Sequence, residues 1–412
     1  MSIGKRRYMK KQSKSPQIRF QNFEDEWLDS TIGRHISLLN GRAYKQEELL
    51  DEGKYKVLRV GNFNTNSKWY YSNLELEENK YVNKGDLLYL WATNFGPEIW
   101  TEEKAIYHYH IWKLEFDRTE INQDYLNIWL ESDKNKIQQN TNGSTMVHIT
   151  KTMMEERGIS LPNFNEQSAI GSLFRTLDDL LASYKDNLTN YQSLKATMLS
   201  KMFPKAGQTV PEIRLDGFEG EWKFIKLAEA ILEAYQGINT ASDKVEYSIS
   251  GIPILQAKHI TNGQINYRDT RYLDMEIYEH YISKYMPKKG EILFANIGTI
   301  GPSVLVDSDK MFLIAWNILK ISIKDNYSPV FIKIILSLLD SKHIFERITT
   351  GNATKFINKD EIMDIRISVP SLEEQQAIGA YFSNLDNLIA AHQEKIMQLE
   401  TLKKKLLQDM FI

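Results

Sequence analysis

Apolar residues recur at alternating spacings of three and four in two long segments of the chain. The seam positions are Phe174, Leu177, Leu181, Tyr184, Leu188 and Tyr191 in the first segment, and Phe382, Leu385, Ile389, His392, Ile396 and Leu399 in the second. This spacing is typical of the a and d positions of a left-handed coiled coil. We expect Leu194 and Met198, and likewise Leu402 and Leu406, to continue the two seams after a local phase slip.

Both segments begin with a helix-start pattern that follows a proline. Asn163 stands three residues before Glu166, and Ser371 stands three residues before Glu374. This is the spacing of an N-cap residue and its capping-box glutamate. A helix of about 38 residues at 1.5 Å per residue would be roughly 57 Å long.

The two segments are copies of one another within a tandem repeat. Residues 166–203 align with residues 374–411 at a fixed offset of 208, with 15 identities in 38 positions. Residues 16–27 and 211–222 share seven identities in twelve positions. We expect the two amphipathic helices to pair antiparallel in an intramolecular coiled coil. The alternatives are that each helix lies across its own domain or that it drives homodimerisation.

Between the repeated ends, short β-type segments mix with helical ones. The strand candidates are residues 55–60, 85–91, 111–116, 252–257, 291–295 and 316–323, and the helix candidates are 125–137 and 329–345. Strands and helices do not alternate strictly, so the pattern predicts an α+β fold with mostly antiparallel sheets. The expected organisation is a basic leader (1–15), a first domain (16–162), a helix (163–204), a linker (205–210), a second domain (211–370) and a C-terminal helix (371–412).

Composition narrows the class of protein. The 412 residues include 51 Lys and Arg, 54 Asp and Glu, and no cysteine. The absence of cysteine excludes disulfides and thiolate metal sites and fits a cytoplasmic protein. The longest apolar stretch, 330–339, is too short for a membrane span. A net charge of -3 argues at first sight against nucleic-acid binding, which usually leaves a basic footprint.

Catalytic chemistry finds little support in the sequence. No phosphate-binding loop of the P-loop or dinucleotide type is present. His108 and His110 could share a strand face, but no third metal ligand is recognisable. Asp216 and Glu221 superficially resemble a nuclease cluster, yet the first repeat lacks the aspartate. We therefore expect neither a metal site nor a catalytic site in this chain.

Loops rich in amide, hydroxyl and basic side chains form three matched pairs between the repeats. Such side chains are the ones that contact base edges and phosphates in DNA. The candidate DNA-binding residues are Arg59, Asn62, Asn64, Lys68, Asn94 and Ser144 in the first repeat, and Gln256, Lys258, His259, Asn296, Thr299 and Lys355 in the second.

The layout resembles the specificity subunit of Type I restriction–modification systems. The resemblance is carried by residues 211–222, by Gly290-Glu291-Ile292-Leu293-Phe294 with Gly298-Thr299-Ile300-Gly301, and by the doubled helix start at 161–170 and 369–378. It covers nearly everything from residue 16 onward. The first domain departs more, with Asn94-Phe95-Gly96-Pro97 where the second has Gly-Thr-Ile-Gly.

The resemblance implies a non-catalytic bacterial subunit with two target recognition domains, each reading half of a bipartite double-stranded DNA target. The coiled coil would set the spacing and dock two methyltransferase subunits, and restriction subunits would join them. S-adenosylmethionine, ATP and Mg are then expected on the partners, for adenine-N6 methylation and ATP-dependent cleavage, with no cofactor in this chain. The partners would also supply much of the positive charge. The alternatives are a coiled-coil scaffold without DNA readout and, more remotely, an enzyme.

Overall fold

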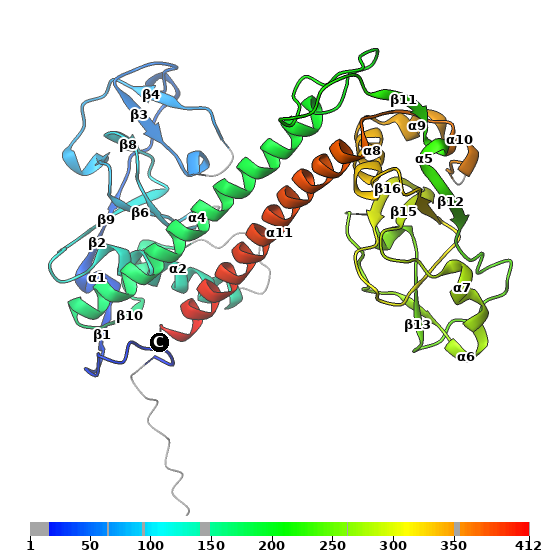
Figure 1. Cartoon of the computed structure of the whole chain (residues 1–412). Helices are drawn as coiled ribbons and strands as arrows, with labels where there is room; N and C mark the ends of the chain where they lie inside the picture. Colours follow the sequence, from blue (N-terminus) through cyan, green and yellow to red (C-terminus); the bar gives the residue numbers. More distant parts are fainter. Residues whose placement is uncertain are drawn as a thin grey trace, which may run out of the picture. The chain divides into compact units, whose positions relative to one another are not determined.

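The chain divides into two units in the computed structural model, which describes residues 16–63, 66–92, 95–140, 149–261, 263–349 and 355–411. Unit 1 combines the chain up to Asp186 with the part from Gln393 onward, and unit 2 runs from Asn187 to His392. The boundary falls inside both long helices, α4 (Phe164–Lys201) and α11 (Leu372–Asp409), which Figure 1 shows in green and red. Each unit therefore contains one segment of each helix.

Unit 1 holds three antiparallel or mixed sheets and the helices that cover them. The sheet orders are β2-β9-β6-β7, β4-β3-β8-β5 and β1-β10. The strands are β1 (Leu28–Thr31), β2 (Ile36–Asn40), β3 (Tyr55–Leu58), β4 (Tyr70–Ser72), β5 (Tyr81–Val82), β6 (Leu87–Leu90), β7 (Gly96–Ile99), β8 (Ala105–Tyr107), β9 (Ile111–Phe116) and β10 (Gly158–Leu161). The helices besides α4 are α1 (Ile32–His35), α2 (Gln123–Asn140) and α3 (Lys151–Glu155).

Unit 2 repeats this plan. Its sheet orders are β12-β18-β15-β16, β14-β13-β17 and β11-β19. The strands are β11 (Lys223–Lys226), β12 (Ile231–Gln236), β13 (Ile252–Leu255), β14 (Arg271–Leu273), β15 (Ile292–Ile297), β16 (Thr299–Leu305), β17 (Leu313–Ile314), β18 (Ile318–Ile323) and β19 (Arg366–Val369). The helices besides α11 are α5 (Leu227–Ala230), α6 (Met275–Tyr278), α7 (Ile282–Tyr285), α8 (Pro329–Ser341), α9 (Ile344–Ile348) and α10 (Lys359–Met363).

The strand pairing confirms the predicted α+β class and the repeat. All strand pairs in the described part of the chain are antiparallel except β3 with β8 and its counterpart β13 with β17. One predicted element is wrong, because the helix expected over 329–345 is divided into α8 and α9. His343 lies between them in the left-handed region at φ 55°, a backbone conformation that interrupts an α-helix.

The predicted N-caps of the long helices are confirmed, but the capping-box glutamates are not. Asn163 Oδ1 accepts from Glu166 N at 2.9 Å, and Ser371 Oγ accepts from Glu374 N at 3.3 Å. The two glutamate side chains are buried and each binds an arginine instead. Glu166 pairs with Arg19 at 2.7 Å, and Glu374 pairs with Arg214 at 2.6 Å. The repeated Pro-x-Ile-Arg segment thus ties the entry of each unit to its long helix.

The two helices contact one another in both units, and they are antiparallel. In unit 1, Lys185 of α4 contacts Glu400 of α11 at 2.7 Å. In unit 2, the later residue Tyr191 contacts the earlier residue His392, with ring centroids 5.1 Å apart. Phe174, Leu177, Leu181, Phe382 and Leu385 of the seam are buried, and Tyr184, Leu188, Ile389, His392 and Ile396 are half-buried.

The expected phase slip in the seam is wrong for Leu194 and Leu402, whereas Met198 and Leu406 pack against the cores of unit 2 and unit 1 as predicted. Leu194 and Leu402 are 37% and 45% exposed, and the alternating spacing continues instead through Lys195 and Lys403. Lys195 Nζ lies 2.5 Å from an oxygen of Asp386 in unit 2, and Lys403 Nζ lies 2.8 Å from an oxygen of Asp178 in unit 1. Both lysines and both aspartates are related by the offset of 208, so the two ion pairs are equivalent.

Each unit closes its core with the end of a long helix. In unit 2, Phe203 follows α4 and lies 6.2 Å from Phe382 and 5.8 Å from Trp222. In unit 1, its counterpart Phe411 follows α11 and lies 6.1 Å from Phe174. Trp222 is thus a core residue, as expected from the structural interpretation of the segment around it.

Candidate nucleic-acid interface

The loop after β3 holds three of the predicted residues of unit 1. Asn62 Oδ1 accepts from Arg59 N at 3.0 Å, and Asn62 Nδ2 donates to Lys68 O at 3.1 Å. The Arg59 guanidinium lies 4.3 Å from the centre of the Tyr70 ring, and the Lys68 side chain is 61% exposed. Asn62 therefore fixes the loop, and Arg59 and Lys68 supply its positive charge. Asn64 lies outside the described residues.

The corresponding loop in unit 2 follows β13. Lys258 is exposed and Gln256 is half-buried. His259 is only 4% exposed, and its Nδ1 accepts from Gln256 N at 2.8 Å. The His259 ring is therefore turned into the loop and orders its backbone.

The β15–β16 hairpin contains the next predicted pair, Asn296 and Thr299. Thr299 is exposed, but Asn296 is 2% exposed and its amide is fully engaged. Asn296 Nδ2 donates to Gln236 Oε1 at 3.1 Å and to Ile357 O at 3.2 Å. The Asn296 side chain therefore links internal segments of the unit. Asn94 and Ser144 lie outside the described part of the chain.

Hydrogen bonds join these segments of unit 2 into one cluster around the turn between β17 and β18. Asn317 Oδ1 in this turn accepts from Ala257 N at 3.2 Å, which connects the turn to the loop of Lys258. Gln236 Nε2 donates to Trp316 O and to Asn296 Oδ1. Gly298 N donates to the main-chain oxygen of the exposed Lys355 at 2.8 Å. Sequence reasoning missed Gln236, Trp316 and Asn317, because no pattern distinguishes single residues in a turn.

In unit 1 the equivalent turn contains His108 and His110, whose rings lie 4.8 Å apart. Burial, together with the charges of His110 and Arg59, lowers the pKa of His108 to about 4. His108 is therefore neutral near pH 7, and the positive charge at this loop comes from Arg59. Within the described ranges, no group of three or more His, Asp or Glu side chains could hold a metal ion.

A glycine directly after β2 in unit 1, and directly after β12 in unit 2, allows the chain to pass close to the backbone of each turn. A Cβ added at Gly41 would overlap with the carbonyl oxygens of Tyr107 and His108, and one added at Gly237 would overlap with that of Ala315. We expect Gly41→Ala to destabilise unit 1 by about 1–3 kcal/mol through overpacking. Gly158→Ala is the matched control in unit 1, because its Cβ would meet only Ser30 O at 3.9 Å. Chemical denaturation of the two variants measures the difference, and equal stability would contradict the close approach.

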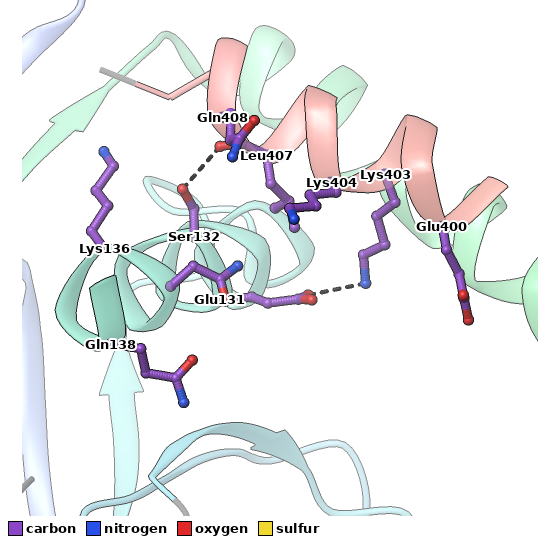
Figure 2. Close-up of a pocket in the computed structure, with 10 residues that line it drawn as sticks. Glu131, Ser132, Lys136, Gln138, Glu400, Lys403, Lys404, Leu407 and Gln408 are labelled. Carbon is purple, nitrogen blue, oxygen red and sulfur yellow. Dashed lines mark hydrogen bonds and ion pairs between the residues drawn. The ribbon is translucent and has the colours of Figure 1, made fainter. Parts of the chain in front are cut away.

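A groove of about 680 Å³ in unit 1 lies between α2 and α11, away from these loops (Figure 2). Figure 2 shows Lys403 directed toward Glu131, and their charged atoms are 3.1 Å apart. Ser132 Oγ donates to Leu407 O at 3.1 Å. These side chains already bind α2 to α11, so the groove is a feature of helix packing.

Comparison with known proteins gives the class of this two-domain chain. The Type I restriction modification DNA specificity domain matches twice, over residues 24–191 and 219–401. The chain therefore belongs to the Type I restriction–modification DNA specificity family. No helix in the described ranges is long and apolar enough to cross a membrane.

Similar proteins span nearly the whole chain. It is 24% identical to the Type I restriction enzyme MjaVIII specificity subunit of Methanocaldococcus jannaschii, over 93% of this chain and 91% of that protein. It is 22% identical to the EcoBI specificity subunit of Escherichia coli, over 87% of this chain and 78% of that protein. The crystal structure of the S subunit from M. genitalium has the same fold, with a TM-score of 0.64, 17% identity and coverage of 97% and 99%.

Proposed function

We propose that this specificity subunit reads a bipartite double-stranded DNA target, one half-site with each unit. The observation that carries the proposal is that each unit has a cluster of loops around an equivalent turn. The two clusters stand on the same scaffold but present different side chains. Unit 1 presents the half-buried Arg59 and the exposed Lys68, and unit 2 presents the exposed Lys258, Thr299 and Lys355. Shared backbone geometry with divergent side chains is what two independent readers of different sequences require.

In this proposal the paired helices form a coiled coil that sets the distance between the half-sites. Its support is the continuous 38-residue length of α4 and of α11, together with the equivalent ion pairs of Lys195 and Lys403. A charge pair between the two helices favours one register, because a shifted helix would leave a lysine in the seam without its aspartate.

The helices also dock two methyltransferase subunits. The support for this step is that exposed leucines recur at equivalent positions of the two long helices. Leu180 and Leu402 are exposed in unit 1, and Leu388 and Leu194 are their equivalents in unit 2. The two pairs of leucines are related by the repeat offset, and two equivalent sets of exposed side chains suit two copies of one partner.

The catalytic chemistry then belongs to the cytoplasmic complex, and this chain has no catalytic role. The modification subunits use S-adenosylmethionine to methylate adenine N6, and restriction subunits use ATP and Mg for cleavage. Partner subunits also supply much of the phosphate neutralisation, because this chain has a net charge of -3.

A domain exchange tests independent reading. Residues 30–160 are replaced by the same region of another family member, and the full chain is co-expressed with its modification subunits. Base-resolved mapping of methylated adenines should show one altered half-site and one unchanged half-site. A change in both half-sites, or in neither, would contradict the proposal. The reciprocal exchange of residues 225–367 should alter only the other half-site.

A further inference from the structure

The turn between β8 and β9 in unit 1 and the turn between β17 and β18 in unit 2 share one hydrogen-bond frame. Tyr109 N donates to Arg42 O at 3.1 Å, and Trp316 N donates to Ile238 O at 2.8 Å. The residue before each aromatic also donates at 2.8 Å, from His108 to Leu58 O and from Ala315 to Leu255 O. Position 109 is therefore structurally equivalent to position 316.

Both equivalent positions carry an aromatic side chain that is 39% exposed. The main chain beneath each ring is held firmly, since Trp91 Nε1 donates to Tyr109 O at 2.9 Å and Gln236 Nε2 donates to Trp316 O. Fixing the backbone of a turn does not require a large ring at its surface. A partly exposed ring at the equivalent position of both units is suited to a contact with a shared class of ligand.

Basic residues belong to the segments that are hydrogen-bonded to each turn. In unit 1, Arg59 directly follows Leu58, the residue whose carbonyl holds the turn. In unit 2, Lys258 belongs to the loop that Asn317 holds, and Lys355 belongs to the segment that Gly298 holds. Basic residues on segments joined to an exposed ring suit duplex DNA, because phosphates bind the cations while the ring reaches a base edge.

We propose that Tyr109 and Trp316 are equivalent DNA-contacting residues, each making an apolar contact with base pairs of one half-site. This assignment rests on the function proposed above and adds a specific residue to each reader. The contact is one that a ring makes with the methyl group or edge of a base in a groove. Because the two rings differ in size and polarity, each selects different base pairs.

The test uses the full-length chain co-purified with its modification subunits and a pool of random-sequence duplex DNA, with sequencing of the bound fraction. The wild-type chain should enrich two separated half-motifs. Tyr109→Ala should lower the enrichment of one half-motif by roughly tenfold at one or two positions, and Trp316→Ala should do the same to the other. Tyr109→Phe should retain the wild-type motif, because it keeps the ring.

Phe164→Ala and Phe224→Ala are the matched controls, since these rings are 39% and 62% exposed but lie outside the turns, at the start of α4 and in β11. Both controls should enrich the wild-type motif. If the wild-type chain enriches no bipartite motif, the proposed function fails and the assignment fails with it. If the wild-type motif is bipartite but both alanine variants leave it unchanged, only the assignment is overturned. Loss of both half-motifs in a single variant would also overturn it.

Discussion

Removing one heptad from each long helix is expected to bring the two recognised half-sites closer by about three base pairs. Deleting residues 187–193 and 390–396 shortens the helices by roughly 10.5 Å, at 1.5 Å per residue, and DNA rises about 3.4 Å per base pair. The deletions remove the contact of Tyr191 with His392 but retain Lys195, Asp386, Lys185 and Glu400. A seven-residue deletion preserves the alternating seam, so the pairing of the helices should survive.

Adenine methylation mapping with co-expressed modification subunits measures the spacer. The sequences of both half-sites should stay the same while the spacer shortens. A mismatched control lacks only residues 187–193, so Lys195 and Asp386 cannot pair while Lys185 and Glu400 remain paired. This control should lose stability and methylation. An unchanged spacer in the paired deletion would contradict the role of the helices in spacing.

Arg214→Ala is expected to destabilise unit 2 by about 3–5 kcal/mol, because it leaves a buried carboxylate without its charge partner. The Arg214 guanidinium makes two bonds to Glu374, at 2.7 and 2.6 Å, and Glu374 is only 1% exposed. The same guanidinium donates to the carbonyl oxygens of Glu219 and Gly220. Arg214→Lys should recover only part of the loss, since an ammonium cannot reproduce the paired bonds.

Denaturant unfolding, with hydrogen exchange to separate the two units, measures this effect. Lys226→Ala provides a control in the same unit, because its ion pair with Asp364 is exposed and should contribute at most about 1 kcal/mol. Combining Arg214→Ala with Glu374→Gln should restore part of the stability, since the buried charge is removed. Equal stability of Arg214→Ala and Lys226→Ala would contradict the argument.

The long helices could be predicted from sequence because their seams repeat twice at a fixed offset. The positions of Lys195 and Lys403 in the seam could not be predicted. A lysine breaks the apolar pattern of a seam, and its aspartate partner on the other helix is not evident from the sequence. The capping-box prediction failed for a similar reason. The arginine that binds Glu166 lies 147 residues away in the chain, beyond any local pattern.

The candidate loops were found in the sequence by their side-chain types, but side-chain type does not determine the direction of a side chain. His259 and Asn296 have DNA-binding chemistry and use it inside the domain. Tyr109 and Trp316 were missed because their equivalence lies in backbone hydrogen bonds, where the flanking residues share little identity.

Each core is closed by the end of a long helix. As a result, unit 2 can be completed before unit 1 during synthesis. Unit 1 contains most of the residues that are made first, yet it needs Phe411, and Ile18 N donates to Asp409 O at 3.0 Å. At about 5–20 residues per second, a ribosome needs roughly 10–40 s to travel from Asp186 to Gln393. Unit 2, which is bounded by Asn187 and His392, is complete before that. The domain made first therefore finishes folding last.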